Sequence, residues 1–556
     1  MKKIIISIAA VALVSFSSVS CIEEVLPQSA TVTSNQVAEA PGSYDLMVQA
    51  VTSTLCGKFL YGGNDKKYGN DFGLPAFYLM RDVMGQDMAY PYQNWFSSWY
   101  TCSNLGPSWA NTQRPWTLYY GWIKSCNNVI SLAGSDPGKG YITGAGIAYA
   151  MRAYYYMDLA RMFAQKPYTV DKESETVPII TESTSLAELA HNPRATNSVM
   201  WDFIISDLDK AEKYLADYKR GDVYTPDVSV VYGLKARAYL EMGEWAKAKE
   251  YAGKAKEGYT IMDEAAYTDW DTGFNTPNSS WMLGMTYKSD DPNILINDGD
   301  SSWGSMMCME INPSTSGCGY AANYGQPFLI DRHLYETVPA TDWRKKCYVD
   351  FEVDDLAKDD AIKLLSKYSK HPDWLYNLNI QTYEKHGGME LKFRTAGGEE
   401  GRNNQYVGFC VAVPMMRVEE MYLIEAEAAG MLNESEGIQL LTAFAKTRDD
   451  NFVYGMHNEA YGNTKTSAFV NEVWWQRRIE FWGEGLATFD IKRLQKGIIR
   501  SYAGSNHADL YRWNSDTTPQ WMNFCIVQTE TNYNFDCTNN PDPIAPVGNS
   551  PEYSFQ

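Results

Sequence analysis

The chain has 556 residues, of which 45% are hydrophobic and 21% are charged, a balance typical of globular proteins with a large packed core. Its formal net charge of −20 excludes the basic surface that nucleic-acid binding requires. Anionic lipid headgroups would also repel such a chain, so any attachment to a membrane must be covalent or hydrophobic.

The first segment, residues 1–20, is predicted to be a signal peptide. Lys2 and Lys3 form a positive start, an apolar stretch too short to span a bilayer follows, and small residues precede Cys21. This order resembles a bacterial lipoprotein signal, in which cleavage leaves Cys21 as a lipidated N-terminus. The alternative is an ordinary secretory signal that is cut nearby. Residues 21–42 are polar and rich in turn formers, so we expect a lipidated flexible tether there.

Helical periodicity dominates the next part of the chain, from about residue 43 to 257. Residues 116–130 carry a broad apolar face, and residues 145–163 form a second strong helical pattern of small and aromatic residues. Thr196 is expected to cap a helix that runs to about Tyr214. Helices therefore build most of this half of the chain.

The segment 225–257 has the most informative pattern. Thr225 and Pro226 are expected to open a helix as its N-cap and first residue. Small and aromatic residues then recur at helical spacing, namely Ala236, Tyr239, Gly243, Ala248, Ala252 and Ala255. This pattern is typical of a tetratricopeptide-like helix hairpin with its turn at the glycine. One hairpin cannot bury its own apolar face, so neighbouring helices must stack on it.

From residue 258 the periodicity fades, and Gly, Pro, Asn, Asp and Ser become frequent. Helical patterns return at residues 414–431, 436–446 and 466–481. The predicted fold is mainly α, with a tetratricopeptide-like helical scaffold (about 43–257 and 411–500). It carries loop-rich parts at about 258–410 and 501–556, and loops on a rigid scaffold are where binding is expected.

Metal and cofactor signals are weak in this sequence. There is no C-x-x-C pair, the six histidines show no metal-ligand spacing, and no phosphate-binding or dinucleotide fingerprint occurs. We therefore expect no metal and no cofactor. Residues 297–300 form an ordinary turn or a calcium loop. Cys308 with Cys318, and Cys525 with Cys537, form local disulfides or stay as free buried thiols.

Two runs in the second half of the chain carry a family resemblance. Residues 416–428 (MRVEEMYLIEAEA) resemble the R-x-x-E-x-Y-L-x-x-A-E-A signature of SusD/RagB-type outer-membrane lipoproteins. Residues 476–485 and 489–493 resemble that family's E-R-R-x-E-L-x-x-E-G and D-L-x-R motifs. The motif residues are Arg417, Glu420, Glu427, Arg477, Arg478, Glu480, Glu484, Asp490 and Arg493.

The resemblance spans nearly all of the mature chain and implies a SusD-like domain over residues 43–556. Proteins of this kind are attached to the outer face of the outer membrane of Bacteroidetes-type bacteria. They pair with a TonB-dependent (SusC-like) transporter and capture a nutrient, most often a glycan, for import. The resemblance further implies that the helices face the transporter and that the loops hold the ligand.

The carboxylates of the motif runs permit two interpretations. Glu420 and Glu427 lie on one helix face, which allows a glycosidase pair. The favoured interpretation is a buried ion-pair network that holds two helices together, with no catalytic residue. The protein is then a binder and not an enzyme.

Aromatic residues in loops are the predicted ligand contacts, because a sugar ring stacks its C–H face on Trp or Tyr. One cluster contains Trp95 and Trp99, with Arg81 upstream, and a second contains Trp281, Trp303, Tyr320 and Tyr324. The alternative for each single Trp is core packing or transporter contact. Capture of a glycan is the leading hypothesis for function. The alternatives are a binder of peptides or other non-sugar nutrients on the same scaffold and, ranked lower, a surface glycoside hydrolase.

Overall fold

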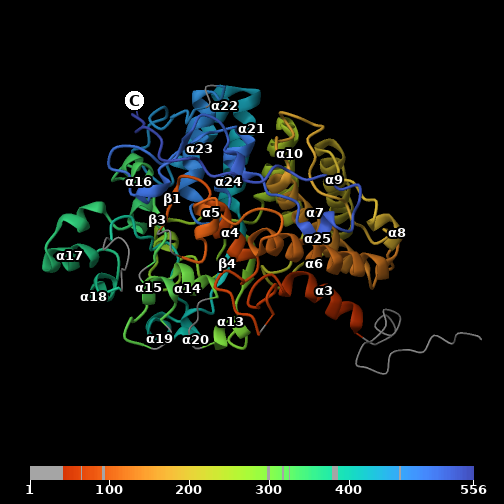
Figure 1. Cartoon of the computed structure of the whole chain (residues 1–556), viewed down its shortest axis with the longest axis horizontal. Coiled ribbons are helices and arrows are strands. Elements are labelled where there is room, and N and C mark those ends of the chain that lie inside the picture. The colour runs from red at the N-terminus through yellow and green to blue at the C-terminus, as the bar shows by residue number, and fades with distance from the viewer. Residues whose placement is uncertain are drawn as a thin grey trace, which may run out of the picture. The chain divides into compact units, whose positions relative to one another are not determined.

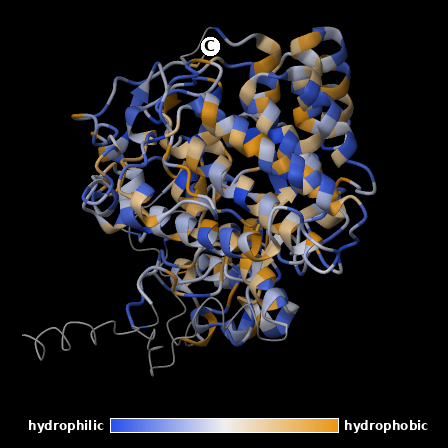
Figure 2. Ribbon diagram, turned by 90° about the vertical axis from the view of Figure 1, so that its right-hand side faces the viewer, coloured by the Kyte–Doolittle hydropathy of each residue, from blue (hydrophilic) through white to orange (hydrophobic). Residues whose placement is uncertain are grey.

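A stack of long helices forms the first half of the molecule, because these segments carry apolar residues at helical spacing. α6 (Ala110–Ala133), α7 (Ile142–Phe163), α9 (Asn197–Leu215) and α10 (Val228–Met242) follow one another in the chain and lie together on the right of Figure 1. α7 packs on both α6 and α9, and α10 packs on α9. Figure 2 shows hydrophilic and hydrophobic residues side by side along these helices.

The computed structural model describes residues 42–555 except for 64, 91–93, 297–300, 316–317, 325, 379–385 and 463–464. Residues 47–556 form one compact unit. The predicted signal peptide, Cys21 and the tether before residue 42 lie outside the described residues, and so does the turn at 297–300. Within the described ranges, no helix combines the length and the apolar character that crossing a bilayer requires.

The predicted hairpin is present. α10 ends at Met242, Gly243 adopts the left-handed conformation, and α11 spans Trp245–Ala255. The alanines that face the partner helix are fully buried, as close helix packing requires. The predicted helix start is wrong by two residues, because Asp227 and not Thr225 is the N-cap. Its carboxylate accepts from the backbone N–H groups of Ser229 and Val230 and satisfies two donors that the helix leaves open.

The turn at Gly243 supports a prediction about stability. Gly243 has φ +71, and a Cβ added there lies 3.1 Å from Cγ2 of Thr169. An L-residue in this conformation costs about 1–2 kcal/mol, so Gly243→Ala is expected to lower the free energy of unfolding by about that amount. Gly253→Ala is the matched control, since Gly253 is inside α11 and meets only Oε1 of Glu425, at 3.7 Å. Urea denaturation measures both, and equal midpoints for the two variants would contradict a strained turn.

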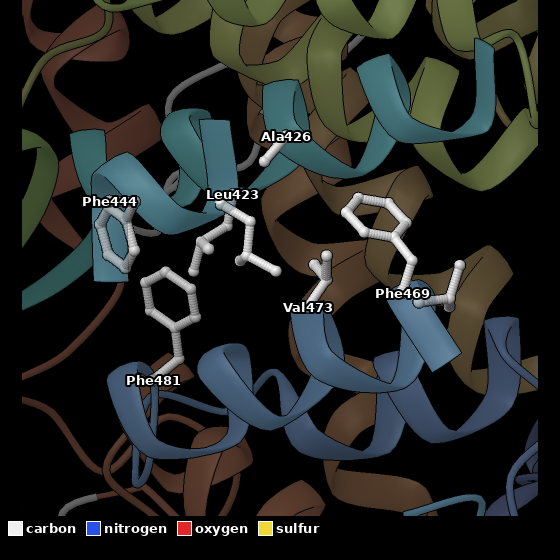
Figure 3. Packing of buried hydrophobic residues seen from close by; sticks show 8 residues of the cluster. Leu423, Ala426, Phe444, Phe469, Val473 and Phe481 are labelled. Carbon is white, nitrogen blue, oxygen red and sulfur yellow. The ribbon is translucent and has the colours of Figure 1, made fainter. Parts of the chain in front are cut away.

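The second group of scaffold helices completes the stack. α21 (Val418–Leu432) packs on α11, α22 (Glu434–Ala445) packs on α21, and α23 (Ala468–Glu480) contacts both. Figure 3 shows their shared core, in which Leu423 of α21 and Phe444 of α22 face Phe469 and Val473 of α23 and Phe481 directly after it. α11 and α21 are thereby neighbours in one superhelix although residues 256–417 separate them in the sequence. These residues form an insertion between the two helices.

The insertion and the remaining connections consist of short elements. α21 begins at Val418 and not at 414 as predicted, because residues 412–417 pair as strand β4 with β2 (Trp281 opposite Arg417, Thr286 opposite Ala412). The other pairs are β1 with β3 and β5 with β6, all antiparallel.

Before and within the helical stack are α3 (Ser43–Ser53), α4 (Leu74–Asp82), β1 (Met88–Ala89), α5 (Ser97–Tyr100) and α8 (Leu186–Leu189). The insertion contains α12 (Glu264–Tyr267), β2 (Trp281–Thr286), α13 (Pro292–Leu295), α14 (Trp303–Met307), α15 (Tyr320–Tyr324), β3 (Leu329–Ile330), α16 (Arg332–Thr337), η1 (Trp343–Cys347), η2 (Phe351–Asp355), α17 (Lys358–Leu365), α18 (Pro372–Tyr376), α19 (Gly398–Asn403), α20 (Gln405–Gly408) and β4 (Ala412–Arg417). The C-terminal part contains α24 (Ala487–Arg493), β5 (Ile498–Ile499), η3 (Asp509–Tyr511), β6 (Asn514–Ser515), η4 (Gln520–Met522) and α25 (Gln528–Thr531).

The motif residues form buried ion pairs that join distant segments. Arg417 bonds Glu480 and Glu484, Arg477 bonds Asp490, and Arg493 bonds both Asp490 and Glu427. Two of the partners come from outside the motif runs. Arg478 pairs with Asp87 at 2.6 Å, and Glu420 pairs with Arg237 of α10 at 2.6 Å. The network therefore fastens the two helical groups and the segment after α4 to one another.

The four cysteines considered for local disulfides are free thiols. Cys308, Cys318, Cys525 and Cys537 are buried, and burial raises the pKa of the Cys525 and Cys537 thiols to about 12. They pack as small apolar side chains.

Candidate functional site

Four of the seven predicted ligand contacts are buried, which is a correction to the sequence-based expectation. Trp99 is 2% exposed, and Arg81, Trp281 and Trp303 are 1% exposed, so none offers a face to a ligand. Trp303 packs edge-on against Phe393, with ring centroids 5.0 Å apart. Arg81 donates to Asp158 (3.2 Å) and to the Gly485 carbonyl (2.9 Å). These side chains fill the core because large rings and a paired guanidinium stabilise the junction of several segments.

Trp95 and Tyr324 are each 38% exposed, and they come from the two different predicted clusters. The structure brings their loops together, because Asn94 Nδ2 donates to the Gln326 carbonyl at 3.3 Å. Tyr320 and Tyr324 lie on α15 with ring centroids 5.1 Å apart. The three predicted ligand contacts that are not buried, Trp95, Tyr320 and Tyr324, therefore come from two segments that contact each other.

A third segment, between α3 and α4, completes this neighbourhood. The Trp95 ring lies directly on the backbone of Gly69, where an added Cβ falls 2.2 Å from Cδ1 of the indole, so only glycine fits. Tyr68, next to Gly69, is 38% exposed. Asp71 holds this loop by accepting from the backbone N–H groups of Leu60, Tyr61 and Gly62 at 2.7–3.1 Å. We call Tyr61, Tyr68, Trp95, Tyr320 and Tyr324 the aromatic loop surface.

Unsatisfied polar groups lie behind these rings. The Arg114 guanidinium, from the first turns of α6, is 5.6 Å from the ring centres of both Tyr61 and Tyr68. Its Nε and Nη1 atoms are buried and have no acceptor among the described residues. Burial lowers the pKa of Arg114, and the Asp71 carboxylate acts against that shift. Asn70 donates to the Trp95 carbonyl at 2.8 Å, while its Oδ1 has no donor in the same described set.

The arrangement can bind a ligand that combines apolar ring faces with hydroxyl groups. Exposed rings supply stacking, while the buried Asn70 and Arg114 side chains lie beneath them and hold the loop. The sequence interpretation missed Tyr61, Tyr68, Asn70 and Arg114. The sequence pattern could have identified the two tyrosines, because residues 61–71 (YGGNDKKYGND) form a polar, glycine-rich stretch like that of the second predicted cluster.

Among the described residues, no group of His, Cys, Asp or Glu side chains is placed to hold a metal ion. Glu480 is fully buried and is engaged by Arg344, Arg417 and Arg448 at 3.1–3.2 Å, and these guanidinium groups lower its pKa against the effect of burial. Glu419 and Glu420 are likewise buried in ion pairs. The motif carboxylates therefore contact arginines and not a ligand surface.

Comparison with known proteins gives two family matches. Residues 73–240 match a SusD-like family described as starch-binding and associating with the outer membrane, and residues 333–545 match the SusD family (SusD_RagB). Together these matches cover more than half of the chain. No curated protein matches the sequence.

Several solved structures share the fold. A SusD-like carbohydrate binding protein from Bacteroides vulgatus is 21% identical, with a TM-score of 0.69, and the match covers 89% of this chain and 97% of that one. A SusD superfamily protein from Bacteroides thetaiotaomicron is 18% identical (TM-score 0.64; 92% and 100% covered). Surface glycan-binding protein A from Bacteroides thetaiotaomicron, in complex with laminarihexaose, is 16% identical (TM-score 0.60; 88% and 97% covered).

Proposed function

Since the chain belongs to the SusD/RagB family, we propose that it is a cell-surface lipoprotein that captures a glycan and delivers it to a TonB-dependent transporter. Cys21 carries the lipid in this proposal, and residues 21–42 are the tether. The protein faces the exterior of the outer membrane. The support comes from the family matches, from the lipoprotein-like start of the sequence, and from the laminarihexaose bound by one neighbour of the same fold.

The aromatic loop surface is the observation that carries the glycan assignment. Tyr68, Trp95 and Tyr324 expose equal fractions of their side chains although they come from three separate segments. Exposed rings that gather on one surface mark a binding site, and a glycan offers successive ring faces on which they stack. Asn70 bonds the Trp95 carbonyl, and the Arg114 guanidinium lies against the Tyr61 and Tyr68 rings, so both buried side chains support the surface from beneath.

The helical scaffold supports the transporter part of the proposal. Exposed apolar side chains occur at the end of α21 and after α22, where Leu432 is 55% and Met456 is 71% exposed. A partner protein that covered such side chains would remove them from water. We propose that these exposed side chains contact the transporter while the aromatic loop surface holds the ligand.

The protein binds without turnover in this proposal. Glu419, Glu420, Glu427 and Glu480 are buried and paired with arginine. A general acid or a nucleophile must reach the scissile bond, and these groups do not reach a surface.

Calorimetric titration of the full chain with a panel of polysaccharides and oligosaccharides, laminarihexaose included, tests the assignment. Trp95→Ala and Tyr68→Ala are each expected to weaken glycan binding about tenfold, which corresponds to about 1.4 kcal/mol per ring. Trp109→Ala is the matched control, since Trp109 is also exposed but lies at the start of α6 outside the aromatic loop surface. Binding of peptides with no affinity for any glycan would reject the glycan assignment. Release of shortened sugars would reject the non-enzymatic one.

A further inference from the structure

Residues 541–548 (PDPIAPVG) form a proline-rich segment on the surface, and residues 541–546 belong to no helix or strand. Pro543 and Pro546 fix their own φ at about −65° and carry no N–H group, so this segment cannot pair as an inner strand of a sheet. Prolines at this spacing favour the polyproline II conformation, a left-handed helix with about three residues per turn. Such a segment presents the same edge at every third residue.

The burial of the side chains follows this period of three. Ile544 is 73% exposed and Val547 is fully exposed (102%), whereas Pro543 and Pro546, each one residue earlier, are half-buried. One edge of the segment therefore lies against the protein, and the other directs two aliphatic side chains into water. Apolar side chains in phase on one exposed edge are what a proline-rich ligand offers to a binding groove.

The Gln520 side chain, from η4, anchors one end of this segment. Its Nε2 donates to the carbonyls of Pro541 and Asp542, each at 3.2 Å, and its Oε1 accepts from the backbone N–H of Ile544 at 3.1 Å. A single side chain therefore fixes the backbone from residue 541 to residue 544.

Residues 549 and 550 anchor the other end. Asn549 Oδ1 accepts from the backbone N–H of Arg512 at 3.3 Å, and the Ser550 N–H donates to the Arg512 carbonyl at 3.0 Å. Between the two anchors, residues 545–548 form no hydrogen bond with any residue that the structure describes. The segment is thus held in its extended shape in advance, and a preorganised ligand loses less conformational entropy when a partner binds it.

The chemistry of the segment selects the kind of partner. Grooves lined by Trp and Tyr bind proline-rich segments, because the rings pack on prolines and aliphatic side chains while their N–H and O–H groups donate to open carbonyls. Asp542 and Glu552, on either side of the exposed edge in the sequence, are exposed. Asp509 is also exposed (87%), although Arg512 pairs with it at 2.8 Å. These carboxylates favour a groove with a cationic rim.

Other occupants fit this segment less well. The carboxylates repel anionic lipid headgroups, and two aliphatic side chains bury too little area to hold a protein at a bilayer. A glycan stacks on aromatic rings, and the edge formed by Ile544 and Val547 carries none. A second copy of this chain would bring a further net charge of −20 toward the same carboxylates.

We propose that residues 541–548 are a recognition segment for a second protein, which binds them in an aromatic groove with a cationic rim. The segment shares no residue with the aromatic loop surface, so this inference stands or fails independently of glycan capture.

Photo-crosslinking in cells that produce the protein tests the inference. Benzoylphenylalanine is placed at Val547 of the full chain and, in a matched control chain, at Leu186 of α8, which is 88% exposed. We expect a protein adduct from position 547 only, joined to a peptide of the partner that contains Trp or Tyr. The yield should fall at least tenfold when Pro543→Ala and Pro546→Ala are added, because alanine does not hold the polyproline II shape.

The thermal midpoint of the double proline variant should stay close to that of the parent, since the segment lies outside the core, so a lost adduct would not reflect unfolding. Four outcomes would overturn the proposal: no protein adduct at position 547, an adduct with a second copy or with lipid, the same adduct from position 186, or a yield that the proline substitutions leave unchanged.

Discussion

Replacing Glu480 with glutamine is expected to lower the free energy of unfolding by about 3–5 kcal/mol, the cost of leaving buried charges without their partner. Glu480 is 0% exposed, and its two carboxylate oxygens accept from Arg344, Arg417 and Arg448. Those arginines come from η1, β4 and the segment after α22. A neutral amide removes the charge that balances them and places N–H donors where guanidinium donors already point.

Chemical denaturation of the full chain at neutral pH measures this effect. Glu250→Gln is the matched control, because Glu250 also pairs with a cation, Lys254 at 2.6 Å, but both side chains are largely exposed. The control is expected to leave the denaturation midpoint unchanged, since exposed pairs contribute little. Similar midpoints for the two variants would show that the buried network does not stabilise the fold.

Glu390 provides the second large expectation, a stability difference that depends on pH. The carboxyl group is 1% exposed, its Oε2 accepts from the backbone N–H groups of Lys392 and Phe393, and its Oε1 has no partner among the described residues. Burial raises its pKa from 4.5 to about 8, against the opposing charges of Arg394 and Lys392. The folded protein therefore keeps this proton through a range in which the unfolded chain loses it.

The sign follows from proton linkage. The stability contributed by protonated Glu390 is fully present below about pH 4.5 and is lost as the pH rises to about 8, at roughly 1.4 kcal/mol per pH unit. Glu390→Gln stays neutral throughout. Its free energy of unfolding should therefore rise relative to that of the wild type from pH 4.5 to 8 and stay level outside that window.

Urea denaturation of both proteins at intervals across this range provides the test. All other titrating groups are shared, so they cancel in the difference between the two proteins. A difference that does not vary with pH would mean that Glu390 is ionised in the folded protein. Glu250→Gln again serves as the control that should show no trend.

Where local sequence decides the structure, prediction succeeded. The hairpin turn at Gly243 and the cap at Thr196 depend on backbone conformation and on short-range hydrogen bonds, and both are present. The start of α21 was predicted too early because residues 412–417 are paired by β2, more than 120 residues away in the chain. No local pattern contains that partner.

The ligand residues show the same limit. Trp95 and Trp99 occur in one short stretch, yet one is exposed and the other is buried. Their difference depends on contacts from elsewhere, such as the bond from Asn70, 25 residues away, that holds the Trp95 carbonyl. Composition identifies aromatic loops, but it does not sort their rings into core and surface.

The sequence by itself determined the mainly helical fold and the family motifs, because helical periodicity and short motifs are visible in residue spacing. The expectation of a binding protein followed from the family resemblance. The tertiary structure decided which groups lie together. It joined α11 to α21 across the insertion, buried Trp281 and Trp303, and assembled the aromatic loop surface from three segments. These outcomes depend on long-range packing, in which free energy is gained only when distant segments meet.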